Sequence, residues 1–317
     1  MKRTTLAALA TAAAVAAVAC GDDIGGDGGA DAGEPDRAPV VFLHGCPPPP
    51  QDNARDAGLF TGDTQSMPDS GMTDFFAARG YPEDLLNVFV YDGATCPPNF
   101  DYARQIADYV EQVVAQSGKP RVDVVAMSMA ALASRAYVRM SGGELVEDLV
   151  TIVGANHGTL VAGNVGEAGQ GEFGYPFWEG AFEAFPAYAC DGESGADPEW
   201  RDEHPSESTD EQVQFYLNGC LTEEGRTAEE DETPFDVGDG GHIRYLAIWN
   251  DLDDIISPRQ ASCLNQSAQN DCSDPVNLRV SIPARTEIIP GFFSSHTEVQ
   301  FDEGAREAVF DFVSAPR

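Results

Sequence analysis

Positive charge is scarce in this chain of 317 residues. Eighteen lysines and arginines stand against 53 aspartates and glutamates, so the formal net charge at pH 7 is −35. A field of this sign repels polyanions, and we therefore expect neither nucleic acid nor an anionic membrane face as a direct partner. We interpret the acidity as a solvated surface, adapted to salt or to solubility outside a cell, and not as information about the fold.

Residues that bind transition metals are few and poorly spaced. The chain has five histidines, no Cys-x-x-Cys pair, and no histidine at ligand spacing from a pair of cysteines. Structural metal sites need such clusters. We therefore expect neither a metal site nor a cofactor.

A long apolar run is missing from the N-terminus, although a short one is present. Lys2 and Arg3 precede Leu6 to Val18, which is too short to span a bilayer and is typical of a targeting segment. The small residues before Cys20 resemble a bacterial lipoprotein cleavage box, which would leave Cys20 as the acylated first residue. An ordinary secretory signal cut nearby is the alternative. Both predict export, with a signal peptide at 1–19, a flexible acidic tether at 20–38 and membrane contact only through the lipid at Cys20.

The remaining cysteines are even in number. Seven cysteines less Cys20 leave six, in a chain bound for an oxidising compartment, which favours disulfides. Six cysteines allow 15 pairings. From proximity and from where the strands should end, we predict the pairs Cys46–Cys96, Cys190–Cys220 and Cys263–Cys272.

The rest of the chain has the composition and pattern of a folded α/β domain. Hydrophobic residues make up 42% of it, and buried strands alternate with amphipathic helices, which indicates a parallel sheet with right-handed crossovers. We predict one domain at 39–317, with a cap-like excursion at 160–241 whose aromatic residues line an acyl-binding cleft or form a small core of their own. The predicted strands are 40–43, 87–91, 122–125, 149–153, 243–249 and 278–289, and the predicted helices are 72–79, 100–117, 130–138 and 304–313.

A serine lies at the joint between one of these strands and the next helix. Ser128 follows the valine-rich strand and precedes a run of helix formers. A nucleophile elbow has this arrangement, because the tight turn exposes the hydroxyl and the first N–H groups of the helix point at the developing oxyanion. The usual pattern is Gly-x-Ser-x-Gly, and Ala126 and Ala130 occupy the glycine positions here. An ordinary helix N-cap serine is the alternative.

Other residues could complete a catalytic site at the carboxyl ends of the strands, where ligands of parallel sheets bind. His44 and Gly45 end the first strand in the manner of an oxyanion loop, so the backbone N–H groups of Cys46 and Met129 are the candidate oxyanion donors. His44 itself is interpreted as structural. A serine needs an imidazole to accept its proton and a carboxylate to orient that imidazole. In chain order, Ser128, an aspartate of the turn at 251–254, and His296 supply nucleophile, acid and base.

Several segments together resemble secreted bacterial lipases of the α/β-hydrolase fold, the class 2 or small Bacillus and Streptomyces type, with extracellular polyhydroxyalkanoate depolymerases as relatives. The resemblance covers about Pro39 to Val313. It is carried by PVVFLHG, ARGYP, DYARQIADYVEQVVAQSGKPRVDVVAMSMAALASRAYV, TIVGANHGT, DETP, YLAIWNDLDDIISP and SSHTEV.

The resemblance implies a fold and assigns roles. In such lipases the serine segment reads AHSMGG, with which Ala126, Ser128 and Met129 agree, whereas Met127 and Ala130 differ. The family's acid begins an Asp-x-Ile/Val-Ile/Val segment, which selects Asp253, and by the same analogy His157 belongs to a structural turn. The implied fold is α/β, an α/β-hydrolase with a mostly parallel central sheet, helices on both faces and a long excursion over the site.

The sequence therefore predicts an exported, monomeric serine hydrolase that cleaves carboxylic esters of lipid type, as a triacylglycerol lipase or esterase, through an acyl-enzyme on Ser128. A non-catalytic surface lipoprotein that keeps the fold is one alternative. A polyhydroxyalkanoate depolymerase is another.

Overall fold

The computed structural model divides the chain into two units, Met1–Asp36 and Arg37–Arg317. The first unit lies outside the described residues, and with it Cys20, the predicted signal peptide and most of the predicted tether. In the second unit the structure describes residues 37–45, 63–64, 67–68, 71–91, 97–159, 213, 217, 221–222, 225–226, 242–264, 272–285, 287–289 and 292–316.

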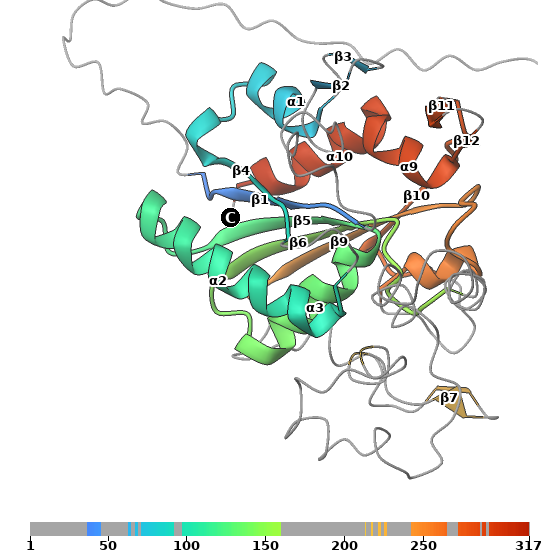
Figure 1. The fold of residues 1–317 in the computed structure, drawn as a ribbon, viewed down its shortest axis with the longest axis horizontal. Helices are drawn as coiled ribbons and strands as arrows, with labels where there is room; N and C mark the ends of the chain where they lie inside the picture. Colours follow the sequence, from blue (N-terminus) through green and yellow to red (C-terminus); the bar gives the residue numbers. More distant parts are fainter. Residues whose placement is uncertain are drawn as a thin grey trace, which may run out of the picture. The chain divides into compact units, whose positions relative to one another are not determined.

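A parallel sheet of six strands forms the centre of this unit (Figure 1). Its strand order is β10-β9-β6-β5-β1-β4, and all five neighbouring pairs are parallel. Parallel neighbours need crossover connections, so this order confirms the predicted α/β architecture. The strands are β1 (Val40–Leu43), β4 (Leu86–Phe89), β5 (Val122–Met127), β6 (Val146–Ile152), β9 (Arg244–Asn250) and β10 (Asn277–Val280).

Helices cover both faces of the sheet and enclose two apolar cores (Figure 1). α2 and α3 pack together on one face, and α1 and α10 lie on the other. Alternate residues of β5 serve the two cores, with Val124 in the first and Val125 in the second, as the two-residue period of a strand requires. The helices are α1 (Met72–Ala78), α2 (Asn99–Ser117), α3 (Met129–Ser141), α9 (Ser295–Glu298) and α10 (Glu303–Ser314), with 3-10 turns η2 (Glu83–Leu85), η5 (Arg259–Ser262) and η6 (Val299–Phe301).

The two helices beside the nucleophile strand differ in how far they are buried. α2 buries one stripe, which includes Ile106 and Val110, and presents its other side to water. α3 buries ten of its 13 residues, all from Met129 to Val138. Each helix ends at a glycine with positive φ, Gly118 at 68° and Gly142 at 74°, a conformation that glycine adopts without steric cost.

The C-terminal region departs from the prediction in two places. The single strand expected at 278–289 is wrong: β10 ends at Val280, and β11 (Glu287–Ile289) pairs antiparallel with β12 (Phe292–Phe293) in a separate small sheet. Pro283 lies between the two strands and cannot donate a ladder hydrogen bond, which is consistent with the break. His296, expected in a loop, lies in α9.

The predicted excursion is described only in part, but Val213 and Leu217 from it are fully buried and belong to the same core as α2 and α3.

Two more short strand pairs lie outside the main sheet. The pairs are β2 (Asp63–Thr64) with β3 (Met67–Pro68), and β7 (Leu221–Thr222) with β8 (Gly225–Arg226).

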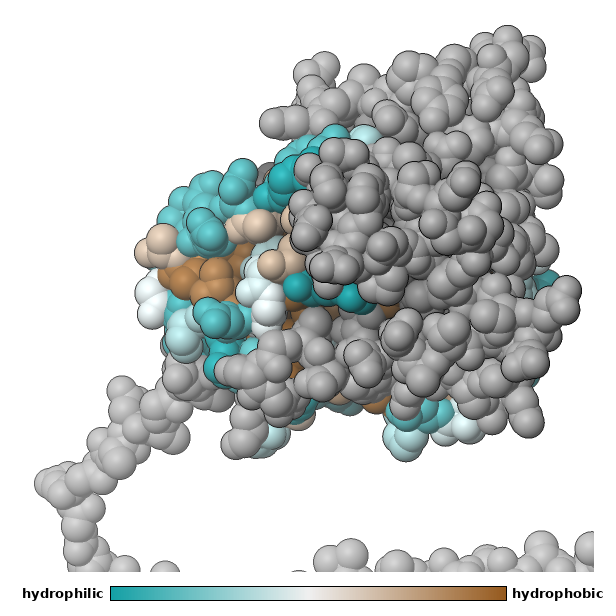
Figure 2. All heavy atoms as spheres, turned by 90° about the horizontal axis from the view of Figure 1, so that it is seen from below, coloured by the Kyte–Doolittle hydropathy of each residue, from teal (hydrophilic) through white to brown (hydrophobic). Residues whose placement is uncertain are grey.

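The described residues expose few large hydrophobic side chains. Figure 2 shows one face, on which a hydrophobic area is bordered by hydrophilic residues. Among the described residues, the large hydrophobic side chains that are exposed are Leu252 and Leu278. None of the helices in the described part of the chain combines the length and the hydrophobicity that a bilayer crossing needs.

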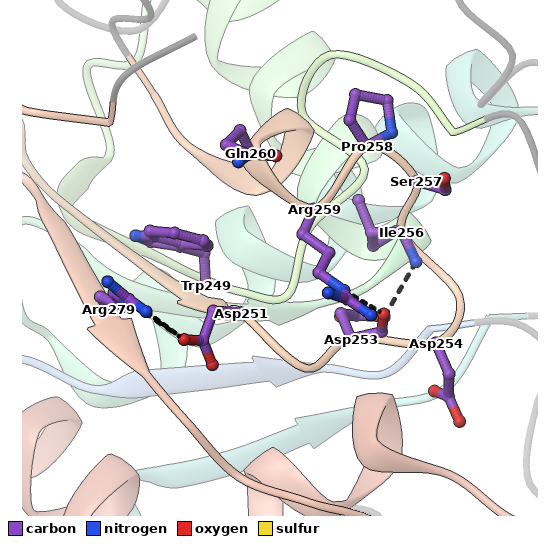
Figure 3. A pocket seen from close by; sticks show the side chains of 10 residues that line it. All are labelled: Trp249, Asp251, Asp253, Asp254, Ile256, Ser257, Pro258, Arg259, Gln260 and Arg279. Atoms are coloured by element: carbon purple, nitrogen blue, oxygen red, sulfur yellow. Dashed lines mark hydrogen bonds and ion pairs between the residues drawn. The ribbon is translucent and has the colours of Figure 1, made fainter.

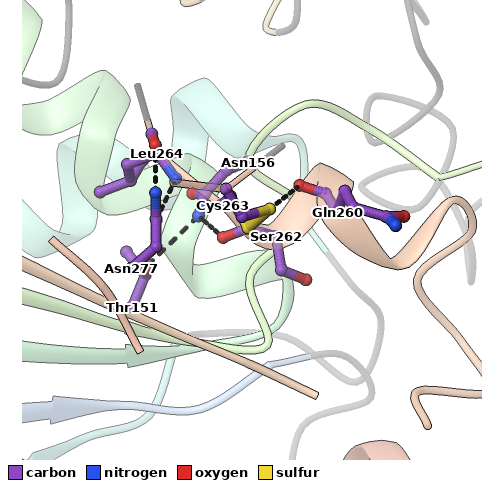
Figure 4. The surroundings of a disulfide bond; sticks show 8 residues. Thr151, Asn156, Gln260, Ser262, Cys263, Leu264 and Asn277 are labelled. Atoms are coloured by element: carbon purple, nitrogen blue, oxygen red, sulfur yellow. Dashed lines mark hydrogen bonds between the residues drawn. A yellow bond between two sulfur atoms is a disulfide. The ribbon is translucent and has the colours of Figure 1, made fainter. Parts of the chain in front are cut away.

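The disulfide Cys263–Cys272 is confirmed (Figure 4). It links the end of η5 to the segment before β10, and the two cysteines form a small apolar cluster with Trp249. Beside it, the side chain of Asn277 accepts from the backbone N–H of Leu264 at 2.8 Å and donates to its carbonyl at 2.7 Å. The other predicted pairs involve Cys46, Cys96, Cys190 and Cys220, which lie outside the described residues.

Candidate active site

Ser128 occupies a strained turn between β5 and α3. Its backbone has φ 56° and ψ −124°, a conformation that non-glycine residues rarely adopt. The N–H of Ser128 donates to the carbonyl of Ile152 in the neighbouring strand at 2.9 Å, which holds the turn against the sheet. A strained residue between a strand and a helix is the geometry of a nucleophile elbow, and an ordinary N-cap serine would have β-region angles and a side-chain cap bond, neither of which is present here.

The two alanines at the glycine positions fit into this turn. Ala126 and Ala130 are both fully buried in the core that α3 shares with the sheet. Space for the helix is made on the opposite side, at Gly154 after β6, where a Cβ would lie only 2.4 Å from the Cβ of Ala131. The close approach of helix to sheet is therefore achieved with a glycine outside the serine segment.

The His-Gly segment after β1 lies directly against the serine. A Cβ built on Gly45 would lie 2.7 Å from the Cβ of Ser128 and 3.2 Å from its Oγ, so only glycine fits without a shift of the neighbouring atoms. The chain that follows β1 thus passes the serine hydroxyl at van der Waals distance. Cys46, the predicted oxyanion donor of this segment, lies outside the described residues, whereas the second predicted donor, the N–H of Met129, opens α3, where the first N–H groups have no partner within the helix.

His44 is a buried structural residue, as expected. Its side chain is 1% exposed, its Nδ1 donates to the carbonyl of Gly45 at 2.7 Å, and its ring lies 4.6 Å from the ring of Tyr91. Burial lowers the pKa of His44 to about 4, against a smaller opposing effect of the Gly45 hydrogen bond, so the imidazole is neutral at physiological pH. The hydroxyl of Tyr102 donates to the His44 carbonyl at 2.9 Å and fixes the end of the strand.

Asp253 and His296 form a buried pair at the carboxyl end of the sheet. The Nδ1 of His296 lies 2.9 Å from Oδ2 and 3.1 Å from Oδ1 of Asp253, and the two residues are 4% and 3% exposed. The N–H groups of Ile255 and Ile256 donate to Oδ1 of Asp253 at 2.8 and 2.9 Å. The carboxylate therefore has its orientation fixed before it meets the imidazole, and its pairing with Nδ1 leaves Nε2 as the ring nitrogen open to a further partner.

The link from this pair to the serine is not closed by a hydrogen bond. Nε2 of His296 is buried and has no hydrogen-bond partner in the described part of the chain. The structure thus brings Asp253 to His296 and Gly45 to Ser128, and leaves the bond between Ser128 Oγ and His296 Nε2 unformed. In enzymes without substrate such catalytic hydrogen bonds are often long and tighten in the complex.

The turn Asn156–Thr159 connects the serine helix to the acid loop. Arg135 of α3, a buried residue, donates from Nη1 to the carbonyl of Asn156 at 2.6 Å. The hydroxyl of Thr159 donates to the carbonyl of Ile255 at 2.7 Å and accepts from the N–H of Ser257 at 3.0 Å. His157 is 3% exposed, and its backbone N–H donates to the carbonyl of Ala261 at 2.8 Å, as expected of a scaffold residue.

A pocket of about 690 Å³ lies beside the acid loop (Figure 3). Arg259 lines the pocket and donates from Nε to the carbonyl of Asp253 at 2.8 Å. Arg279, another lining residue, is paired with Asp251. Ser128 and His296 do not line it. Its walls are Trp249, Asp251, Asp253, Asp254, Ile256, Ser257, Pro258, Arg259, Gln260 and Arg279.

Two residues that organise the site were not predicted from the sequence. The amide of Asn250, fully buried, donates to the carbonyls of Ile282 and Ser295 and accepts from the N–H of Leu252 and of Ile282. Arg135 is the second, and the available signal was an arginine inside the small and apolar run that follows Ser128. Among the described residues, no cluster of three or more His, Cys, Asp or Glu could hold a metal ion.

Comparison with known families assigns the chain. The family described as Lipase (class 2) matches residues 37–197, half of the chain. The chain belongs to the class 2 lipases. The activity of this family is hydrolysis of carboxylic esters, and the α/β-hydrolase fold expected from the resemblance agrees with the parallel sheet and its helices. The matched segment of this lipase contains Ser128 and the His-Gly segment, whereas Asp253 and His296 lie beyond it.

Solved structures of esterases and lipases are similar to this lipase at low identity. The carboxylesterase CesB from Bacillus subtilis is 13% identical, with 90% of this chain and 86% of that chain covered and a TM-score of 0.42. The naproxen esterase from Bacillus subtilis is 12% identical, covering 88% and 85%, with a TM-score of 0.40. A Bacillus licheniformis lipase in its mature form is 15% identical, covering 62% and 69%, with a TM-score of 0.35. No curated protein matches the chain.

Proposed function

We propose that this class 2 lipase cleaves esters of lipid type through an acyl-enzyme, with Ser128 as nucleophile, His296 as general base and Asp253 as the acid that orients the imidazole. The observation that carries the proposal is the buried His296, which is bonded to Asp253 through Nδ1 and whose Nε2 has no hydrogen-bond partner within the described ranges. A carboxylate at Nδ1 keeps the proton on that nitrogen, so Nε2 has a free lone pair to accept a proton.

The chemical steps follow from these groups. Oγ of Ser128 attacks the ester carbonyl carbon while its proton passes to Nε2 of His296. The carbonyl oxygen becomes negative and is stabilised by the N–H of Met129 and of Cys46. The alcohol then leaves with the proton from Nε2, and a water molecule, activated by the same nitrogen, hydrolyses the acyl-enzyme and regenerates the serine.

The strained backbone of Ser128 supports the same assignment. A residue with φ 56° costs folding free energy of order 1–3 kcal/mol, and such residues cluster where function requires them. Close packing of Gly45, the residue before the predicted oxyanion donor, against Oγ supports the proposal.

Labelling by a fluorophosphonate probe tests the proposal on the full chain. Wild type is expected to form a covalent adduct, and Ser128→Ala is expected to form none and to lose about 10⁶-fold in turnover. Ser134→Ala is the matched control, because Ser134 is a buried serine of α3 whose hydroxyl donates to the carbonyl of Ala131. Absence of an adduct in folded wild type would remove the acyl-enzyme and favour a non-catalytic lipoprotein. Esters from acetyl to oleoyl, with polyhydroxybutyrate, separate an esterase, a lipase and a depolymerase.

We also propose that the protein is exported and carries a lipid on Cys20. The support is the basic start, short apolar run and small residues before Cys20. A tether and a lipid there would hold the hydrolase domain, as a monomer, at the cell envelope. With cleavage by an ordinary signal peptidase the same domain would be secreted.

A further inference from the structure

The acid loop carries a second carboxylate that contacts the histidine segment. Oδ1 of Asp254 accepts from the hydroxyl of Ser294 at 2.9 Å and from the backbone N–H of His296 at 3.1 Å. Its Oδ2 accepts from the backbone N–H of Ser295 at 3.2 Å. Ser294 is the N-cap residue of α9 but makes no side-chain cap bond itself, and Asp254 instead accepts from the first two N–H groups of this helix.

We infer that Asp254 is a positioning residue that fixes the imidazole of His296 on its acid, an inference that rests on the proposed function. Asp253 and Asp254 are consecutive, and both bind the same histidine, Asp253 at the ring and Asp254 at the backbone. The bonds form a closed ring of contacts. Within it neither the side-chain torsions of His296 nor the height of α9 above the loop can change without loss of a hydrogen bond.

Two neutral contacts attach the same turn at the residue before the histidine. The hydroxyl of Ser295 donates to the carbonyl of Leu252 at 2.6 Å, and Asn250 donates to the carbonyl of Ser295 at 3.1 Å. Both join Ser295, one residue before the histidine. Asp254 is the residue of the acid loop that binds the backbone N–H of His296 itself, and a charged acceptor makes roughly twice as strong a bond as a neutral one.

The charge of Asp254 is present at neutral pH. Partial burial acts to raise the pKa of Asp254, but the hydrogen bonds from Ser294, His296 and Ser295 outweigh it and hold that pKa below its usual range. The carboxylate is therefore an acceptor for all three groups throughout the pH range in which a neutral imidazole can act as base.

The test compares Asp254→Ala and Asp254→Asn with Asp251→Ala as matched control. Asp251 lies in the same loop and carries the same charge, but its carboxylate is paired with Arg279 on the pocket wall. The readouts are kcat and KM on a short p-nitrophenyl ester, and the low-field proton NMR signal of the Nδ1–H bonded to Asp253. A merely structural role of Asp254 would lower the melting temperature without moving that signal in the folded protein.

For Asp254→Ala we expect kcat to fall by up to about 10²-fold, the effect of a misplacement near 1 Å, with KM changed less than twofold and the low-field signal shifted or lost. Asp254→Asn keeps one oxygen acceptor and should recover part of kcat. Asp251→Ala should leave both readouts as in wild type. Asp254→Ala with wild-type kcat and an unchanged signal would overturn the inference.

The inference and the proposed function fail in distinguishable ways. If wild type forms no fluorophosphonate adduct, the acyl-enzyme is excluded, but the NMR signal in wild type and variants still decides whether Asp254 fixes the imidazole. If Asp254→Ala does not fold, Ser294→Ala removes one donor to the same carboxylate and should lower kcat in the same direction, by a smaller factor. An unchanged kcat and signal in both Ser294→Ala and Asp254→Asn would then overturn the inference.

Discussion

The two ends of the central sheet each hold a buried acidic group beside a basic one, and the two pairs are completed to different degrees. At the amino ends of β6 and β9, Asp148 and Arg244 are opposite each other in the strand register and form two hydrogen bonds, 2.8 and 2.6 Å long. Arg244 also donates to the carbonyl of Phe312 at the end of α10 at 3.1 Å. At the carboxyl end of β9, Asp253 and His296 are also hydrogen-bonded on one side of the ring, but Nε2 has no partner among the described residues.

The pair at the amino ends stabilises the fold, whereas the pair at the carboxyl end leaves one ring nitrogen available for a reaction. Burial raises the pKa of Asp148, and hydrogen bonding to Asp148 raises the pKa of Arg244. Both shifts favour the protonated form, which is neutral for Asp148 and charged for Arg244. The two short hydrogen bonds favour the fully charged pair at neutral pH. The hydrogen bonds of Arg244 join β9 to β6 and to the end of α10. At the other end the described residues include a strained serine and a buried Nε2 without a hydrogen-bond partner among them, and both features have an energetic cost.

Among the variants that separate the two ends of the sheet, replacement of the proposed catalytic acid should give the largest effect, and that effect should be confined to activity. In Asp253→Asn, the side-chain oxygen can still accept from the N–H groups of Ile255 and Ile256, but the amide NH₂ faces Nδ1 and favours the wrong imidazole tautomer. We expect kcat to fall about 10⁴-fold with a free energy of unfolding within about 1 kcal/mol of wild type. Ester hydrolysis and urea denaturation measure the two quantities.

Asp274→Asn is the control for this variant. Oδ1 of Asp274 accepts from the N–H of Val276 two residues on, as Oδ1 of Asp253 does from Ile255, but Asp274 makes no hydrogen bond with His296. It should keep wild-type kcat. If Asp253→Asn retained more than a tenth of wild-type kcat, the functional end of the sheet would not depend on this carboxylate.

Loss of the arginine at the other end should have the opposite signature. Arg244→Leu leaves the fully buried side chain of Asp148 without its cation, which typically costs about 3–5 kcal/mol of unfolding free energy. The kcat of the molecules that remain folded should be unchanged. The cost should shrink at acid pH, where Asp148 can take up a proton and become neutral.

The exposed pair Arg279–Asp251 is the control for burial. The side chain of Arg279 is 64% exposed, and pairs of this kind contribute about 0–1 kcal/mol. Arg279→Leu should therefore change urea denaturation little. A cost below about 1 kcal/mol for Arg244→Leu, or a loss of kcat in its folded fraction, would contradict the division of roles between the ends of the sheet.

The sequence predicted the strands of the functional end better than its contacts. The buried strands were evident because runs of valine such as that of β5 are typical of strands that are covered on both faces. The order of the predicted nucleophile, acid and base followed from the strands that precede them. Asp253 was separated from its neighbours only by a family resemblance. Nothing in the pattern of Asp251, Asp253 and Asp254 shows which carboxylate meets a ring, a backbone or an arginine, because three acids on one turn diverge according to tertiary contacts.

The parts that the sequence did not predict depend on long-range packing. The strand expected at 278–289 was wrong: Pro283 is a signal in the sequence against one continuous strand, but the end of the pairing with β9 at Val280 is set by tertiary contacts. Asn250 binds Ile282 and Ser295, which lie 32 and 45 positions further along the chain. The space that α3 requires is made at Gly154, outside the serine segment. A one-dimensional pattern contains no information on either contact.

A pH titration of stability should give the smallest of these effects and distinguish the ends by their response to acid. His44 lies at the functional end with a pKa lowered to about 4 from 6.5 by burial. Because the folded pKa is the lower one, the unfolded chain takes up a proton first as the pH falls. The stability associated with neutral His44 is complete above about pH 6.5 and is lost between there and about pH 4, up to on the order of 3 kcal/mol.

His44→Gln removes the titrating group, so the difference in unfolding free energy between wild type and variant should change by that amount between pH 7 and pH 4, when both are measured by urea denaturation. An equal pH dependence in the two proteins would mean that the ring of His44 is solvated, and that the chain next to Ser128 is more open than its contacts with Tyr91 and Gly45 indicate.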